Sequence, residues 1–232
     1  MSLVSVIIPS YNRYEQLLQA IASVQAQTYS NIEIIVVNDG STDVRYSHTI
    51  SGVKMIHLPM SSQQRLGYPC GAVPRNAGLK QARGDYIALL DDDDLWLPTK
   101  LEYQIKAMKE SNCKMSCTDG FIGTEPYQEM ESYPLYNQEY YRKDLFRKLQ
   151  IDKFPTQFTL SLIQIHNLII TSSVCFERQL LDTIGYMKLI RNGGEIINGT
   201  RDWQDWNYWR RMLHHTNCLY LTTPFFYYRL RI

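Results

Sequence analysis

The chain has 232 residues, of which 44% are hydrophobic and 20% are charged, and its formal net charge is +1. This length suits one sizeable α/β domain or two tightly joined halves, and it argues against a separate second domain. Because the charge is nearly balanced, the chain has no overall field for nucleic acid or for an anionic membrane, so any polyanionic ligand must be held locally.

Strand and helix signals alternate through the first half of the chain. The predicted elements are a strand at 4–8, a helix carrying Leu17, Leu18, Ile21 and Val24, strands at 32–37 and 53–58, a helix at 74–82 and a strand at 85–90. The apolar residues of the first helix have helical spacing, and the strands read as continuous apolar runs. Repeated β-α-β units of this kind predict an α/β fold with a Rossmann-like, mostly parallel central sheet flanked by helices.

The second half of the chain is less regular. The predicted elements are a helix at 98–109, a strand region at 113–123, helices at 140–149 and 178–184, short strands at 173–176 and 219–222, and a tail at 226–229. In the first half, the loop at 60–73 lies between the predicted strand at 53–58 and the predicted helix at 74–82. This loop contains Gly67, Pro69 and Gly71, and it is expected to be mobile and to cover a ligand.

Cysteine usage and the start of the chain favour a reducing, cytoplasmic location, and peripheral attachment to a membrane stays open. The five cysteines are odd in number and sparse, and the chain enters its first strand without a basic region followed by a long apolar core. The apolar run at 162–170 is too short to cross a bilayer. The triplet Asn198-Gly199-Thr200 matches an N-glycosylation acceptor, which we interpret as a chance match.

Four consecutive aspartates, Asp91 to Asp94, follow a buried strand and precede a second apolar stretch. The carboxyl ends of strands in an open α/β sheet are where ligands bind, and clustered carboxylates suit a divalent cation and the phosphates that it bridges. A solvated acidic turn is the alternative interpretation. Four carboxylates between buried segments are costly, however, unless a cation or a proton neutralises some of them.

Three predicted strand ends carry polar residues to one edge of the sheet. They are the stretches 9–12, 38–41 and 91–94. Tyr11 offers a face to a planar base, Asp39 can accept a hydrogen bond from a base N–H, and the aspartates can hold a cation on a diphosphate. Arg75, at a predicted helix start, favours phosphate oxygens. The pattern indicates a nucleoside diphosphate site, although a rim aromatic, a turn former and a surface arginine remain as alternatives for these three residues.

The chain resembles the inverting glycosyltransferases of family two, which have the GT-A fold. The stretches that carry the resemblance are 4–12, 34–43, 75–78 and 82–94, with weaker similarity at 171–174 and 204–211. The resemblance implies transfer of a sugar from a nucleoside diphosphate donor, most often a UDP-sugar, assisted by Mn²⁺ or Mg²⁺. It also implies a nucleotide-binding half at 1–97 and a smaller acceptor-binding half at 98–232 within a single domain, 1–232.

The resemblance also assigns roles to individual residues. The nucleotide-binding positions that it implies are Pro9, Tyr11, Asn12, Asp39, Arg75, Asp91 and Asp92. In the Asp-x-Asp motif of the family, Asp93 matches the direct metal ligand, and Asp91 lies nearer the ribose or a metal-bound water. Asp92 departs from the small residue that is common between them. Asp94 is left as a group behind the metal ligands or on the acceptor side.

Inversion by direct displacement needs a base, because an acceptor hydroxyl is a poor nucleophile until it loses its proton. Asp205, in an Asp-Trp-x-x-Trp-x-Arg stretch, resembles the catalytic carboxylate of the family, and Asp202 is the alternative. A helix cap is the structural interpretation of Asp205.

The leading hypothesis is therefore a metal-dependent, inverting glycosyltransferase. A nucleotidyltransferase is one alternative, although the glycine-rich activating loop and lysine expected near the first strand are not seen at 9–18. A non-catalytic nucleotide-sugar binding module is the other. The acceptor, whether glycan, protein or lipid, stays open, as does the oligomeric state; no nucleic acid partner is expected.

Overall fold

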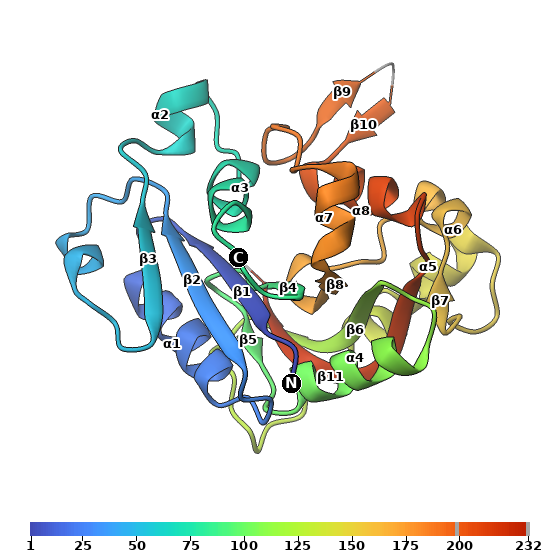
Figure 1. Cartoon of the computed structure of the whole chain (residues 1–232). Coiled ribbons are helices and arrows are strands. Elements are labelled where there is room, and N and C mark those ends of the chain that lie inside the picture. Colours follow the sequence, from blue (N-terminus) through green and yellow to red (C-terminus); the bar gives the residue numbers. More distant parts are fainter. Residues whose placement is uncertain (198–199, 231–232) are drawn as a thin grey trace.

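A computed structural model describes residues 1–197 and 200–230. The first two residues of the Asn198-Gly199-Thr200 triplet lie outside the described residues. The described chain folds around a curled central sheet with helices on both faces (Figure 1), so the predicted α/β fold is confirmed. The sheet has the strand order β3-β2-β1-β4-β8-β6-β11-β5, and β7 pairs with β11 off this path.

The first half of the sheet is parallel, as predicted. Its strands are β1 (Val4–Ser10), β2 (Ile32–Asn38), β3 (Val53–His57) and β4 (Tyr86–Leu89). β1 lies between β2 and β4, and β2 lies between β1 and β3. The apolar residues of β1 are buried on both faces, which explains why this strand reads as a continuous hydrophobic run. The arrangement brings the carboxyl ends of β1, β2 and β4 to one edge of the sheet.

The second half makes the sheet mixed. Its strands are β5 (Leu95–Trp96), β6 (Met115–Gly123), β7 (Gln157–Phe158), β8 (Cys175–Glu177) and β11 (Cys218–Arg229). β8 pairs antiparallel with both β4 and β6, and β11 pairs parallel with β6 but antiparallel with β5 and β7. The strand predicted at 219–222 and the tail predicted at 226–229 form one strand. Its register shifts on both sides of Pro224, a residue that cannot donate a ladder hydrogen bond.

Helices cover both faces of the sheet. Adjacent residues of β1 belong to different apolar clusters: Ile7 shares a cluster with Leu79 of α3 (Ala72–Leu79), whereas Ile8 shares one with Leu17 of α1 (Tyr14–Gln25). The cluster around Ile7 also contains Trp209 of α8 (Gln204–Leu213), and the cluster around Ile8 includes α4 (Lys100–Glu110). The two-residue side-chain period of a strand produces this division into two cores.

Shorter elements complete the fold. They are the helical turns η1 (Val44–Ser47), η2 (Tyr136–Tyr140) and η3 (Thr171–Ser173), the helices α2 (Ser62–Leu66), α5 (Arg142–Leu149), α6 (Leu160–Ile165) and α7 (Arg178–Ile184), and a hairpin of β9 (Glu195–Ile197) and β10 (Thr200–Asp202). The loop predicted at 60–73 contains α2, which a capping box of Ser61 and Gln64 starts. No helix in the described ranges has the length and apolar character needed to cross a membrane.

Lys100 is completely buried at the start of α4. Its ammonium donates a hydrogen bond to Gln104 Oε1 at 2.6 Å and lies 4.1 Å from the centroid of the Trp96 ring. Burial lowers the pKa of Lys100 to about 7. A lysine in the unfolded chain keeps its proton to a pH of about 10. Between these values the unfolded state binds more protons, so the free energy of unfolding increases with pH.

We expect Lys100→Met to remove most of this increase between pH 7 and pH 10, which amounts to at most about 4 kcal/mol at about 1.4 kcal/mol per pH unit. Urea unfolding at pH steps of one measures it. Lys106→Met, an exposed change on the same helix, is the control and keeps the wild-type pH dependence. An unchanged pH dependence in Lys100→Met would contradict the lowered pKa of this lysine.

Candidate active site

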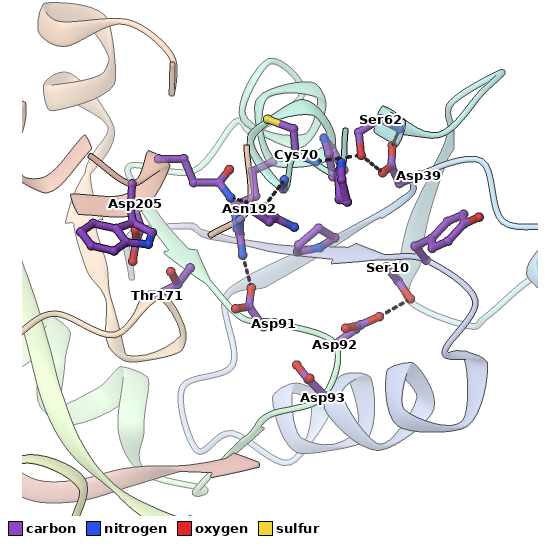
Figure 2. Close-up of a pocket in the computed structure, with 18 of the residues that line it drawn as sticks. Ser10, Asp39, Ser62, Cys70, Asp91, Asp92, Asp93, Thr171, Asn192 and Asp205 are labelled. Atoms are coloured by element: carbon purple, nitrogen blue, oxygen red, sulfur yellow. Dashed lines mark hydrogen bonds and ion pairs between the residues drawn. The ribbon is translucent and has the colours of Figure 1, made fainter. Parts of the chain in front are cut away.

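A large cavity of about 920 Å³ lies at the sheet edge where β1, β2 and β4 end. Residues from distant parts of the chain line it, among them Pro9, Tyr11, Asp39, Arg75, Asp91, Asp92, Asp93 and Asp205. Figure 2 shows Asp39 and Asp205 toward opposite ends of this cavity, with the aspartate run along the side between them. Of the residues that the sequence predicts for the site, the structure brings all but Asn12 and the alternative base Asp202 to this cavity.

The four aspartates alternate between the protein interior and the cavity. Asp92 and Asp94 are 4% and 1% exposed, whereas Asp91 and Asp93 are partly exposed. The run forms a turn, in which Asp94 N donates a hydrogen bond to Asp91 O at 3.2 Å, and it leads directly into β5. The run therefore has two inward carboxyl groups and two that face the cavity.

The inward carboxyl of Asp92 is held by groups near the end of β1. It accepts hydrogen bonds at 2.7 Å from both Ser10 Oγ and Arg13 Nη1 (the first is drawn in Figure 2). Burial raises the pKa of Asp92 to about 6, although Arg13 and Ser10 act in the opposite direction. The structure thus gives Asp92 an internal role beside the nucleotide-binding role that the sequence predicts.

Asp94 is held by the second half of the chain. Its carboxyl accepts a hydrogen bond from Ser172 Oγ at 2.5 Å and one from the backbone N–H of Arg229 at 3.1 Å. Burial, together with the charges of Asp91 and Asp93, raises the pKa of Asp94 well above its ordinary value. Ser172 does not line the large cavity. It is fully buried and holds the aspartate run on the side away from the cavity.

Asp91 and Asp93 remain as the carboxylates that can meet a cation. Asp91 forms an ion pair with Arg75, and Arg13 Nη1 lies 3.4 Å from Asp93 Oδ2. Within the described residues no three His, Cys, Asp or Glu side chains gather as a metal site. Mg²⁺ and similar hard cations are commonly held by one or two carboxylates, with phosphates and waters completing the shell. The residues present fit a cation that is bound jointly with a phosphate ligand.

Arg75 is buried within α3, where its guanidinium meets the aspartates. Burial alone would lower the pKa of Arg75, but Asp91 and, more weakly, Asp205 raise it. A Cβ at Gly71 would collide with the guanidinium and come within 3.3 Å of Gln204 Nε2, so the glycine leaves the space that Arg75 fills. Arg75 therefore stays charged, and its positive charge interacts both with the aspartate run and with Asp205.

Asp39 and Tyr11 form the opposite end of the cavity. Asp39 accepts hydrogen bonds from Ser62 N at 3.0 Å and Ser62 Oγ at 2.7 Å, while burial raises the pKa of its carboxyl (Figure 2). Gly40, with φ +69°, follows it where the backbone of Met60 and Ser61 leaves no room for a Cβ. Tyr11 is 44% exposed, so its ring is accessible to a ligand.

Asn12 organises the neighbouring turn. Its Oδ1 accepts hydrogen bonds from the backbone N–H groups of Thr42 at 2.9 Å and Asp43 at 3.3 Å. Its φ of +52° is tolerated better by asparagine than by most residues. Asn12 does not line the large cavity. Its contribution is therefore indirect, through the backbone of Thr42 and Asp43 that it holds.

The two candidate bases lie in different surroundings. Asp205, in the first turn of α8, lines the cavity and accepts a hydrogen bond from Asn167 Nδ2 at 3.1 Å. Burial raises the pKa of Asp205 against the effects of its hydrogen bonds and of Arg75. Asp202 is buried, accepts a hydrogen bond from Asn207 Nδ2 at 2.9 Å and forms an ion pair with Arg210. Only Asp205 of the two meets the cavity.

Sequence reasoning missed several residues of the site. Arg13 contacts both Asp92 and Asp93, and its position directly after a polar strand end was the available signal. Asn167, which orients Asp205, and Asn192, whose Oδ1 accepts hydrogen bonds from Gly71 N and Gln204 Nε2, come from regions without a recognisable pattern. Long-range contacts of this kind cannot be read from local sequence.

Comparison with known proteins supplies the family. A family model described as Glycosyl transferase family 2 matches residues 5–166. An uncharacterized glycosyltransferase of Rickettsia typhi, RT0329, is 36% identical over 159 residues, which cover 68% of this chain and 47% of that protein. WfaP of Escherichia coli, named as a UDP-Glc:α-D-GlcNAc-diphosphoundecaprenol β-1,3-glucosyltransferase, is 38% identical over 122 residues, 53% of this chain and 47% of WfaP. The chain thus spans less than half the length of these curated relatives.

Solved structures share the fold at low sequence identity. TarS of S. aureus (residues 1–349, in complex with UDP-GlcNAc) has a TM-score of 0.65 and 19% identity, over 99% of this chain and 59% of that one. The mannosyltransferase PcManGT of Pyrobaculum calidifontis, in complex with GDP-Man and Mn²⁺, has a TM-score of 0.59 and 17% identity, over 96% and 55%. Together with the family match, this shared architecture shows that the chain belongs to glycosyl transferase family 2 and has the GT-A fold.

Proposed function

We propose that the chain is a metal-dependent, inverting glycosyltransferase that moves a sugar from a UDP-sugar to an acceptor hydroxyl. The observation that carries the proposal is the position of Asp205 in the same cavity as Asp91 and Asp93. A carboxylate able to accept a proton and carboxylates able to hold a cation on a diphosphate there share one space. The UDP-sugar named for WfaP and the UDP-GlcNAc bound to TarS support a uridine donor.

In this proposal the donor lies along the sheet edge. Tyr11 stacks on the base, and the free lone pairs of Asp39 accept a hydrogen bond from its edge. Pro9 packs beside the nucleoside, and Arg75 lies near the phosphates, where its charge offsets that of the aspartates. This arrangement orders the donor with its sugar toward Asp205.

Asp93 is the proposed ligand of Mn²⁺ or Mg²⁺, with Asp91 nearer the ribose or a metal-bound water. The bound cation supplies Lewis-acid stabilisation of the charge that develops on the departing diphosphate. The chain itself limits how far Asp91 and Asp93 can move, because the adjacent Asp92 and Asp94 are held by hydrogen bonds inside the protein. Fixed ligands of this kind are ready for the cation before the donor arrives.

Asp205 is the proposed general base. It takes the proton of the acceptor hydroxyl, the hydroxyl oxygen bonds to the anomeric carbon of the donor sugar, and the bond from that carbon to the diphosphate oxygen breaks. Attack from the face opposite the leaving group inverts the anomeric centre. The raised pKa of Asp205 suits this role, since a base with a pKa closer to neutrality accepts a proton more readily. Asn167 orients the carboxylate through its amide.

We expect Asp93→Asn to lower the affinity for UDP by about tenfold or more in the presence of Mn²⁺ and to remove most of the dependence on Mn²⁺, because the cation loses a charged ligand. Calorimetric titration with uridine, guanosine, thymidine and adenosine diphosphates, each with and without Mn²⁺, measures this. Asp182→Asn, an exposed change on α7, is the matched control.

Each outcome of the titration is informative. Mn²⁺-dependent binding of UDP that Asp93→Asn retains would show that Asp93 is not the ligand. Preferred binding of another nucleoside diphosphate would overturn the uridine donor. No binding of any of the four would refute the donor site altogether. Donor binding without turnover of any UDP-sugar would favour a non-catalytic binding module.

We expect Asp205→Asn to lower turnover by about 10² to 10⁴ while affinity for UDP stays within about threefold, because a general base acts on the acceptor proton and not on the donor. UDP release in the presence of sugar acceptors measures turnover. Asp202→Asn is the comparison: breaking its ion pair with Arg210 lowers the thermal stability of the fold more than the rate of the folded enzyme. Full activity of Asp205→Asn would exclude it as the base.

A further inference from the structure

A small cavity of about 410 Å³ adjoins the large one. Six residues line it: Lys148, His166, Asn167, Trp203, Asp205 and Trp206. Asn167, Trp203 and Asp205 line both cavities, so a ligand in the small cavity approaches the same carboxylate from a separate space. Its volume is within the range of small-molecule binding sites.

Two indole rings, those of Trp203 and Trp206, line the small cavity. Trp206 Nε1 donates a hydrogen bond to Ile163 O at 2.6 Å, and the guanidinium of Arg210 lies 4.9 Å from the ring centroid. The ring of Trp203 lies 5.6 Å from that of Trp206 at an angle of 42°. Because the N–H of Trp206 is used within the protein and Arg210 covers one face of the ring, a ligand can meet only the remaining carbon surface, and such a surface suits the C–H face of a sugar.

Two side chains of the small cavity are suited to an anion. Lys148 is exposed at the end of α5, and His166 directly follows α6; neither lines the large cavity. An ammonium and an imidazole N–H both donate hydrogen bonds to phosphate oxygens. In the proposed donor arrangement the diphosphate lies near Arg75 and Asp93, so Lys148 and His166 are placed for a different phosphate.

We propose that the small cavity binds the acceptor and that the acceptor is a phosphorylated sugar. Its ring packs against Trp203 and Trp206, its phosphate is bound by Lys148 and His166, and a free hydroxyl meets Asp205. This inference rests on the proposed function, which gives Asp205 its role. The shared chemistry is a phosphate ester on the anomeric oxygen, which a free sugar phosphate and a sugar linked through diphosphate to a lipid both supply.

The test compares charged and uncharged forms of the same sugars. Glucose, galactose and N-acetylglucosamine are each titrated calorimetrically as the methyl α-glycoside, the 1-phosphate and the octyl diphosphate ester, with and without saturating UDP and Mn²⁺. The UDP blocks the large cavity. The variants are Lys148→Met, Lys148→Arg and the matched control Lys143→Met, an exposed change on the same helix that lines neither cavity.

At least one phosphorylated form is expected to bind about tenfold or more tightly than its methyl glycoside, through a charge-assisted hydrogen bond. Lys148→Met removes most of this preference, whereas Lys148→Arg and Lys143→Met keep it. A preference for the diphosphate ester over the 1-phosphate identifies the lipid-linked source, and the reverse identifies the free sugar phosphate. Equal binding of charged and uncharged forms, or equal losses in Lys148→Met and Lys143→Met, overturns the proposal. Binding of UDP is measured separately, so a failed donor site and a failed acceptor site are distinguished.

Discussion

The burial of two carboxyl groups within the aspartate run is the constraint on which the site depends. Asp92 and Asp94 are removed from water between two apolar segments, and both are satisfied only by partners from elsewhere in the chain. Ser10 and Arg13 belong to the first half of the chain, whereas Ser172 and the backbone of Arg229 belong to the second half. The run therefore joins the two halves at the place where two of its carboxylates face the large cavity.

Charge compensation links the aspartate run to the candidate base. Arg75 forms an ion pair with Asp91, and the charge of Asp205 also raises the pKa of Arg75. One buried cation therefore interacts with both groups of carboxylates. Gly71 provides the space for that side chain, and Asn192 bonds to Gly71 and Gln204 across the same corner. Asp205 lines both cavities, so one carboxylate is accessible from two separate spaces, which the proposals above assign to the donor and to the acceptor.

Local sequence predicted those parts of the site that depend on strand ends. The stretches 9–12, 38–41 and 91–94 could be placed together because the carboxyl ends of neighbouring parallel strands meet at one edge. The second half was harder, since its strands are short, antiparallel to their neighbours or interrupted. The residues of β11 suggest only a short strand and a tail, because Pro224 breaks the pattern. The helix α2 was missed for a similar reason, as one turn of helix carries too little periodicity to be recognised.

The inward and outward division of the aspartates also could not be read from four identical letters. It depends on the turn that the run forms before β5, closed by a hydrogen bond from Asp94 N to Asp91 O at 3.2 Å, which directs Asp92 and Asp94 toward their buried partners. This turn makes the spacing of the run as important as its acidity. A single insertion or deletion here would change the turn and move the buried carboxyl groups away from the side chains and the backbone N–H that hold them. Such a change would leave buried polar groups without partners, which destabilises the fold even where every acidic residue is kept.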